Sequence, residues 1–397
     1  MGSNLALFFS KDLYFGLYYC FGGYLIIFVQ LFNKIKMSVN VFTEWAPLKE
    51  VIIGSCLSFN FEGFDNIFHY LYQDHLNRMG KEKLNYHVAK RYLLERESDL
   101  DNFQRILEKR GIKVRRPRKI KKPVSLKTPF FKSIINPVDA PRDMFLCLGD
   151  EIIETPPTNR KRYFEGMMLH DVFKDYFRNG ARWTLAPRPK LTDASFDFTH
   201  WSKISDFHNL EDIDFKFDIA FDAANCLKFG KDILINIGHK NHELGAVWLQ
   251  RHLGQKFRVN PVRITDMHID GMLMPLSPGV LLINKKLKSM ISQLPKPLQN
   301  WKMIEVTEEH VIKEFHYPSD HPQLASFTGM AVNVLSLDEK TVCIREHAEL
   351  KKLLEKNGFD VIPIQLRHRE LLGGSLHCVT LDVCREEILK DYFYGPE

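Results

Sequence analysis

Residues 232–264 read DILINIGHKNHELGAVWLQRHLGQKFRVNPVRI, and this stretch contains one complete folding unit. Residues 232–238 are a short run dominated by isoleucine and leucine and closed by a glycine, which is typical of a buried strand. An amphipathic helical pattern follows at 241–254, and a second β-rich run occupies 256–264. The stretch therefore predicts a strand, a helix and a second strand in that order.

The same unit occurs five times along the chain. The other four occurrences span residues 48–117, with a long insertion, 144–187, 279–306 and 341–366. An open doubly wound sheet is one arrangement of such units, but no glycine-rich phosphate loop follows the first strand. Repeated units bury their faces against their neighbours, and a closed ring removes exposed sheet edges. The predicted fold class is α/β, a five-bladed α/β propeller of strand–helix–strand modules.

Composition indicates a globular protein with a large core. The 397 residues are 45% hydrophobic and 26% charged, and the formal net charge is +6. Seven cysteines at irregular spacings, without CxxC pairs, argue against a disulfide framework and against a zinc ribbon. We expect a reducing, cytoplasmic location.

The N-terminal segment differs from the rest of the chain. Residues 13–33 carry no charge, are rich in aromatic side chains and precede Lys34 and Lys36. About 20 apolar residues can cross a bilayer, so this segment is either a membrane anchor, a dispensable extension ahead of a later start at Met37, or a packed helix. We expect residues 1–36 to be a separate extension and residues 37–397 to form a single domain.

Polar residues with catalytic potential stand at comparable points of different modules. Asp143 precedes the second module, Asp222 the third, and His268 and Asp270 the fourth, whereas Cys378 follows the fifth in GGSLHC. Ring folds bring loops of this kind to one central site. On a strand His268 and Asp270 would share one face. Cys378 read alone is more often a small core residue than a nucleophile.

These residue types suit one chemistry. A thiol nucleophile needs a histidine that moves protons and a carboxylate that orients the histidine. Several further carboxylates around a pocket suit a planar guanidinium, which they bind through charge-assisted hydrogen bonds. The set therefore indicates covalent catalysis on a guanidinium substrate.

From Trp45 onward the chain resembles the amidinotransferases typified by glycine amidinotransferase, which belong to the guanidine-modifying pentein superfamily with a five-bladed α/β propeller. The matching stretches are PRD, GDEIIETP, FDAAN, MHID, GVLL, DHP, NVLSLDEK and the GG, LHC and DV of the C-terminal motif, in this order. Within this family the chain resembles cyanobacterial toxin-pathway enzymes of the saxitoxin type.

The resemblance implies a role for each matched residue. The nucleophile falls on Cys378, the acid/base histidine on His268 and its paired carboxylate on Asp222. The guanidinium-holding acids fall on Asp143 and Asp270. The expected reaction is ping-pong transfer of the amidino group of L-arginine, through an amidino-cysteine intermediate, to an acceptor amine, with release of L-ornithine. The resemblance further implies that no metal and no organic cofactor is needed, and it is compatible with a homodimer.

Several positions depart from the family pattern. Leu287 stands where the family has a carboxylate-binding arginine, with Lys285 and Lys286 beside it, and the serine pair after DHP has become Ser326 and Phe327. Ser326 remains a predicted substrate-binding residue. Because these changes fall at the site, we expect an acceptor other than glycine, such as an intermediate of a guanidinium natural product.

Two other functions stay open. An arginine deiminase-like hydrolase would use the same residues with water as the acceptor. A non-catalytic propeller would bind nucleic acid through the basic run at residues 109–122, although this run is more often a solvated helix end and strand. We expect no nucleic-acid partner. The HKNHE stretch at 239–243 is interpreted as the first turn of a solvated helix and not as half of a metal site, and His377 as a structural residue on the strand face opposite Cys378.

Overall fold

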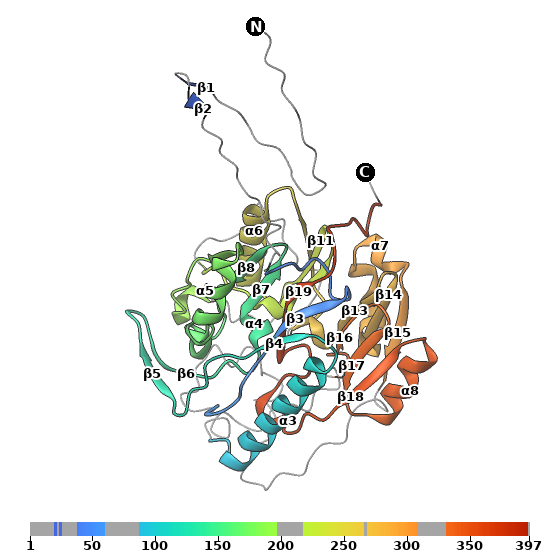
Figure 1. The fold of residues 1–397 in the computed structure, drawn as a ribbon, viewed down its shortest axis with the longest axis horizontal. Coiled ribbons are helices and arrows are strands. Elements are labelled where there is room, and N and C mark those ends of the chain that lie inside the picture. Colours follow the sequence, from blue (N-terminus) through green and yellow to red (C-terminus); the bar gives the residue numbers. More distant parts are fainter. Residues whose placement is uncertain are drawn as a thin grey trace.

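The computed structural model describes most of the chain as a mixed α/β protein (Figure 1). The described residues are 38–59, 87–196, 217–265, 268–307 and 331–395, with the short strands β1 (Cys20–Phe21) and β2 (Tyr24–Leu25). The segment at 13–33 therefore lies largely outside them. Within the described residues, no helix combines the length and the apolar character that a bilayer crossing requires.

Five three-stranded sheets form the body of the molecule. Their strands, sheet by sheet, are β19 (Thr380–Arg385), β3 (Leu48–Ile53) and β4 (Lys113–Arg115); β7 (Phe145–Leu148), β8 (Glu151–Glu154) and β9 (Arg182–Leu185); β10 (Cys226–Phe229), β11 (Asp232–Asn236) and β12 (Arg258–Val262); β13 (Leu273–Ser277), β14 (Val280–Asn284) and β15 (Lys302–Val306); and β16 (Leu335–Ser336), β17 (Thr341–Arg345) and β18 (Asp360–Ile364).

Every sheet has the same strand pattern. The middle strand is antiparallel to the first strand and parallel to the third, as where Leu234 pairs with Leu227 on one side and Asn260 on the other. Parallel strands need a crossover connection, and helices supply it. The predicted strand–helix–strand order is confirmed, and the structure adds the antiparallel first strand to each module.

Helices connect the middle and third strands. They are α3 (Lys90–Glu108), α5 (His170–Arg178), α6 (Lys240–Leu253) and α8 (Ala348–Lys356), whereas the fourth sheet uses a 3-10 helix, η8 (Lys285–Gln293), followed by the short α7 (Lys296–Gln299). The strand–helix–strand pattern predicts an α-helix at 285–295, and the structure has a 3-10 helix there instead. Ser289 donates its hydroxyl to the carbonyl of Lys286, a local bond that competes with the α-helical ladder.

The second module also differs from the prediction. Its expected helix at 162–180 is α-helical only in α5, because two 3-10 turns, η2 (Arg160–Arg162) and η3 (Glu165–Met168), precede it. An antiparallel hairpin of β5 (Val124–Lys127) and β6 (Lys132–Ile135) stands beside this module.

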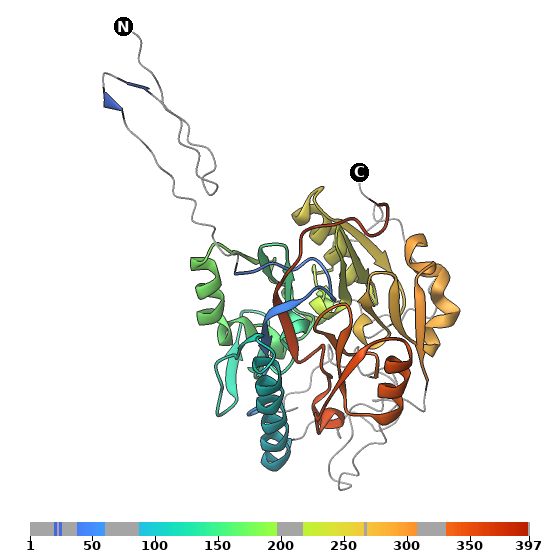
Figure 2. The same ribbon diagram turned by 45° about the vertical axis from the view of Figure 1, so that its right-hand side comes forward.

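The two ends of the described chain meet in one sheet. Strand β19, near the C-terminus, pairs antiparallel with β3, and Thr380 lies opposite Ile53. Figure 2 shows these strands side by side, one red and one blue. The first residues of the described chain extend this closure, since Asn40 donates its amide to the carbonyl oxygens of Arg385 and Glu387.

Both faces of the middle strands are buried against neighbouring sheets. On β3, Ile52 packs with the β7–β8–β9 sheet, whereas Val51 and Ile53 pack with the β16–β17–β18 sheet. On β8, Ile153 joins a cluster with the β10–β11–β12 sheet, and further clusters continue through β14 to β17. Because side chains alternate across a strand, each sheet contacts two neighbours, and the apolar contacts run from sheet to sheet in a cycle.

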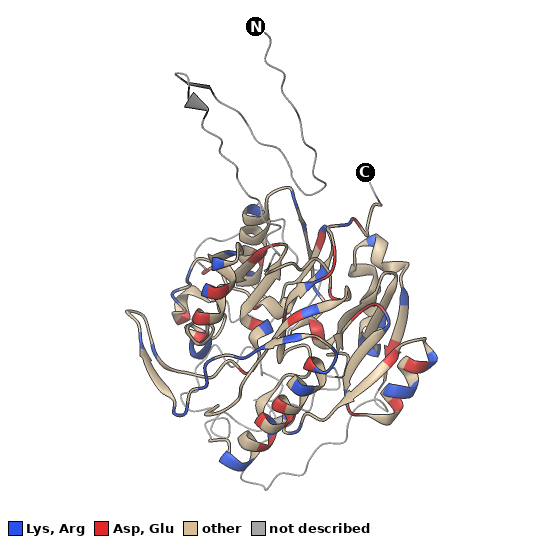
Figure 3. Ribbon diagram, in the orientation of Figure 1, with Lys and Arg blue, Asp and Glu red and all other residues tan. Residues whose placement is uncertain are grey.

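Four of the nine basic residues in the run at 109–122 pair with carboxylates of the protein itself. Arg116 contacts both Glu97 and Asp101 on α3, and Arg115 contacts Asp175 on α5. Figure 3 shows basic and acidic residues interspersed along the ribbon of α3. Seven of the nine basic residues in the run are exposed, and only Arg115 and Arg116 are half-buried, so the prediction of a solvated helix end and strand is confirmed. These ion pairs leave less free positive charge for a polyanion.

Candidate active site

Each of the predicted catalytic residues that the structure describes lies just ahead of the first strand of a sheet. Asp143 belongs to the short helix α4 (Pro141–Met144), which leads into β7. Asp222 and His268 are the N-cap residues of 3-10 turns η6 (Ala223–Asn225) and η7 (Ile269–Gly271), which lead into β10 and β13. Cys378 lies in the turn before β19. The sheets therefore carry these side chains to a common region.

His268 and Asp222 form a hydrogen-bonded pair. His268 Nε2 lies 2.9 Å from Asp222 Oδ2, and Thr158 Oγ1 donates to the other oxygen of Asp222 at 2.8 Å. Burial lowers the pKa of His268, but the charge of Asp143 and the bond to Asp222 outweigh burial and raise the pKa to about 9. At neutral pH His268 therefore holds a proton, which it can give to a leaving group.

The two carboxylate oxygens of Asp143 differ in their contacts. Its Oδ2 accepts from Arg162, which also binds Glu165 at 2.8 Å. Its Oδ1 is buried, accepts no hydrogen bond from any described residue and lies 3.7 Å from His268 Nδ1. Burial raises the pKa of Asp143, and Arg162 opposes this effect. A buried carboxylate oxygen without a donor is costly, so this atom marks a place for a cationic group.

Cys378 lies between Asp270 and Asn333. The thiol donates to Asp270 Oδ2 at 3.4 Å, and Asn333 Nδ2 donates to Sγ at 3.1 Å. Burial raises the pKa of Cys378 well above its usual range, and the negative charges of Asp270 and Asp143 raise it further. Without a ligand the sulfur is therefore held as a neutral thiol.

Two local predictions around these residues are wrong. The HID stretch is a 3-10 turn and not a strand, although the charge of Asp270 still acts on His268 and helps to raise its pKa. His377 does not point away from Cys378, because both belong to a turn and not to a strand. His377 Nδ1 lies 2.8 Å from Asp270 Oδ2, the oxygen that also accepts from Cys378.

A buried network of charges lies behind His377. His377 Nε2 is 3.3 Å from Glu44 Oε2, and Glu44 also binds Lys228 and Arg142. Arg142 donates Nε to the carbonyl of His377 at 3.0 Å and pairs with Asp382. The network fixes the turn that presents Cys378.

The HKNHE stretch is buried, contrary to the prediction of a solvated turn. His239 caps α6 and His242 lies in its first turn, and their rings are 3.7 Å apart at 1% and 2% exposure. Burial lowers the pKa of His239 to about 3 and that of His242 well below its usual range, so both are neutral. Within the described residues, no group of three or more His, Cys, Asp and Glu side chains fits a metal ion.

The residues that depart from the family pattern are only partly described. Ser326 and Phe327 lie outside the described residues. Leu287 is fully buried in the apolar core, whereas Lys285 and Lys286 are exposed on η8. Leu287 therefore contributes no polar group to a ligand.

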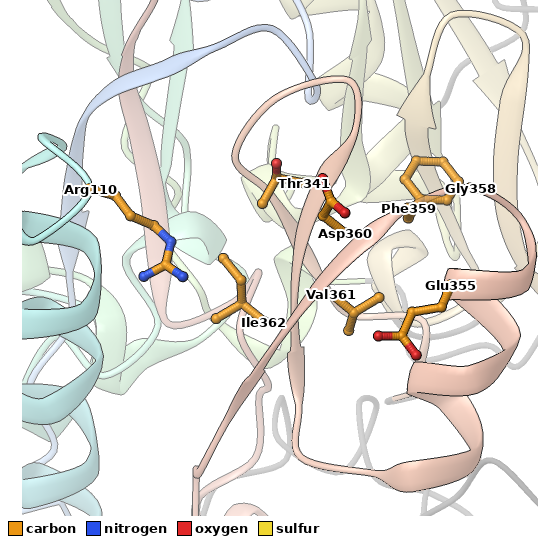
Figure 4. Close-up of a pocket in the computed structure, with 8 residues that line it drawn as sticks. All are labelled: Arg110, Thr341, Glu355, Gly358, Phe359, Asp360, Val361 and Ile362. Atoms are coloured by element: carbon orange, nitrogen blue, oxygen red, sulfur yellow. The ribbon is translucent and has the colours of Figure 1, made fainter.

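A hollow of about 650 Å³ opens elsewhere, beside the C-terminal end of α3 and the outer edge of β18 (Figure 4). None of the predicted site residues lines it. Its lining consists of Arg110, Thr341, Glu355, Gly358, Phe359, Asp360, Val361 and Ile362.

Comparison with known proteins places the chain in a family. No protein-family model matches it. It is 33% identical over 357 residues to inosamine-phosphate amidinotransferase 1 of Streptomyces glaucescens, a match that covers 89% of this chain and 99% of that protein. The chain belongs to the amidinotransferase family. L-arginine:L-lysine amidinotransferase of Pseudomonas savastanoi pv. phaseolicola is 31% identical over 363 residues, which cover 88% of this chain and 95% of that enzyme.

A solved amidinotransferase also shares the fold. SxtG, an amidinotransferase from Microseira wollei in the saxitoxin biosynthetic pathway, matches with a TM-score of 0.77 and 33% identity, over 90% of this chain and 100% of that one. The resemblance drawn from the sequence motifs is thus confirmed.

Sequence analysis assigned no role to several residues that contact the predicted ones. Thr158, Arg162 and Glu44 are distant in sequence from their partners, and no short motif marks them. Asn333 did carry a signal, because it opens the NVLSLDEK stretch and precedes a strand in the same way as the predicted residues.

Proposed function

We propose that the protein transfers the amidino group of L-arginine to an acceptor amine through a covalent adduct on Cys378. One observation carries the proposal: the Cys378 thiol contacts Asp270, and Asp143 beside His268 holds a buried carboxylate oxygen that accepts no hydrogen bond from a described residue. The relative named L-arginine:L-lysine amidinotransferase supports arginine as the donor. Asp143 and Asp270 then bind the guanidinium by charge-assisted hydrogen bonds.

Donor binding activates the thiol. The negative charges of Asp270 and Asp143 hold the pKa of Cys378 high after burial has raised it, and a bound guanidinium cancels these charges. The thiol loses its proton to solvent as the donor binds, and solvent returns this proton after the product has left. The thiolate attacks the guanidinium carbon and forms a carbon–sulfur bond. His268 gives its proton to the nitrogen of the departing ornithine as the carbon–nitrogen bond breaks, which leaves an amidino-cysteine and a neutral His268.

The second half-reaction reverses these roles. Neutral His268, oriented by Asp222, accepts a proton from the incoming amine. The amine nitrogen bonds to the amidino carbon, the carbon–sulfur bond breaks and the thiolate leaves. His268 is protonated again, and the guanidinylated product departs.

The acceptor is an amine other than glycine and belongs to the synthesis of a guanidinium natural product. The buried Leu287 replaces the arginine that the resemblance places there, so the substrate contacts differ from those of a glycine-specific enzyme. The saxitoxin-pathway relative supports a natural-product acceptor. Residues 37–397 form one domain, and its five sheets are the blades of a five-bladed propeller, which the cyclic apolar contacts support.

Mass spectrometry after incubation with L-arginine alone tests the reaction. We expect an amidino group on the peptide that contains Cys378, and no adduct in Cys378→Ser. Cys384→Ala, which removes a half-buried thiol of β19, is the matched control and should keep the adduct. Ornithine should accumulate once an amine is supplied. Citrulline without added amine would instead identify a guanidine hydrolase, and neither product would reject both.

A further inference from the structure

The five sheets are equivalent in how they present side chains. A polar residue lies two to four positions before the first strand in four of them, and these residues are Asp143, Asp222, Asp270 and Cys378. In the remaining sheet Asn333 stands two residues before β16. The pseudo-symmetry therefore gives the site a fifth member.

The contacts of Asn333 fix the orientation of its amide. One side-chain atom faces the backbone N–H groups of His377, at 3.0 Å, and Cys378, at 3.2 Å. Backbone N–H groups only donate, so the atom that faces them is the oxygen. The nitrogen consequently faces Cys378 Sγ, 3.1 Å away. Asn333 is 1% exposed, so water does not compete for these bonds.

We propose that Asn333 is a catalytic residue that stabilises the anionic sulfur of Cys378 by donating Nδ2–H to it. The proposal rests on the proposed role of Cys378 as the nucleophile. The amide keeps its protons throughout, and the sulfur gains charge when the thiol loses its proton and again when the carbon–sulfur bond breaks. Asp270 cannot stabilise the anionic sulfur in this way, because an ionised carboxylate only accepts hydrogen bonds.

The surroundings of the sulfur explain why such a donor is needed. Asp270 contacts Sγ directly, and Asp143 adds a second negative charge nearby. The neighbouring side chains of His377 and Arg142 make their contacts with Asp270, Glu44 and backbone oxygens. Among the described side chains, Asn333 is the one that donates to Sγ, and its bond opposes the rise in the pKa of Cys378 caused first by burial and then by the two carboxylates.

The test replaces Asn333 by aspartate in the full-length protein. Asn333→Asp keeps an oxygen for the two backbone N–H groups and exchanges the donor beside the sulfur for a second oxygen. We expect iodoacetamide to alkylate Cys378 about tenfold more slowly, or slower still, at neutral pH, because a hydrogen bond to a charged atom is lost. The midpoint of the pH profile of alkylation should move to higher pH. Peptide mass spectrometry separates Cys378 from the other cysteines.

Two further variants complete the test. Asn179→Asp makes the same change at an exposed C-cap of α5 and should alkylate like the wild type. Asn333→Ala removes the donor without adding charge and should slow alkylation in the same direction. Unfolding would have the opposite effect, since an exposed thiol reacts faster. Wild-type alkylation in either folded Asn333 variant would overturn the proposal, whether or not arginine leaves an adduct on Cys378, so the outcome is separate from that of the proposed reaction.

Discussion

Protonated His268 lies between the carboxylates of Asp222 and Asp143. One ring nitrogen contacts Asp222 and the other lies near Asp143. These charges keep the proton on the ring up to a pKa of about 9, although burial alone would remove it. The residue that we propose as the proton donor to the leaving group therefore also contributes to stability.

This dual role predicts a pH-dependent stability. Because the pKa of His268 is about 9 in the folded protein and about 6.5 in an unfolded chain, its stabilisation is complete below pH 6.5 and is lost as the pH rises through 9. We expect the unfolding free energy of the wild type, relative to His268→Gln, to fall by on the order of 3 kcal/mol over this window. Urea unfolding at several pH values measures the difference, and parallel profiles would contradict it.

At the scale of the element, the Gly373–Gly374 turn controls the position of the thiol. Both glycines have positive φ, 75° and 68°, a region that other residues rarely adopt. A Cβ on Gly374 would lie 3.1 Å from Cys378 Cβ. The backbone of this turn therefore leaves no room for a side chain beside the nucleophile.

Gly374→Ala should consequently impair activity more than stability. We expect at least a tenfold loss of amidino transfer, since a displacement of the reacting atom by about 1 Å costs about two orders of magnitude. Gly358→Ala is the control, because it has the same strained sign of φ and an added Cβ meets nothing within 4 Å. It should lower the melting temperature and leave the turnover rate unchanged. Equal rate losses in the two variants would refute the argument.

The sequence predicted the strand–helix–strand modules better than the lengths of their strands and the types of their helices. The middle strands are buried apolar runs next to a helix, so the sequence pattern reveals them. The first strand β16 has only Leu335 and Ser336, and it gains its identity from pairing with the next strand. The 3-10 turn at His268 and the contacts around Cys378 depend on residues that are far apart in the sequence. The contact of His377 with Glu44 is one example, and no local sequence pattern encodes it.

At the scale of the whole molecule, a buried charge network joins segments that are far apart in the chain. Lys228 on β10 lies 2.6 Å from Glu44, with 3% and 1% of the side chains exposed. Burial raises the pKa of Glu44, but Lys228, His377 and Arg142 together hold it well below its usual range. The network connects Glu44, which precedes β3 in the sequence, to the turn that contains Cys378.

Lys228→Met should therefore destabilise the protein by about 3–5 kcal/mol, because it leaves one buried charge of a pair behind. Lys49→Met is the matched control. Lys49 pairs with Glu386 at the surface, where 52% and 69% of the side chains are exposed, and exposed pairs contribute at most about 1 kcal/mol. Urea unfolding of both variants at pH 7 measures the contrast. A loss below 1 kcal/mol in Lys228→Met would show that the network adds little to stability.

The pairing of β19 with β3 can form only late in the synthesis of the chain. Asn40 and Arg385 lie 345 positions apart, so the ribosome makes the middle strand β3 early and its partner β19 late. Until these late residues have been added, β3 has no antiparallel partner and the nascent chain has no thiol at position 378. Unpaired edges in incomplete chains favour aggregation. Premature termination before residue 378 therefore yields chains that have no nucleophile and expose the edge of β3.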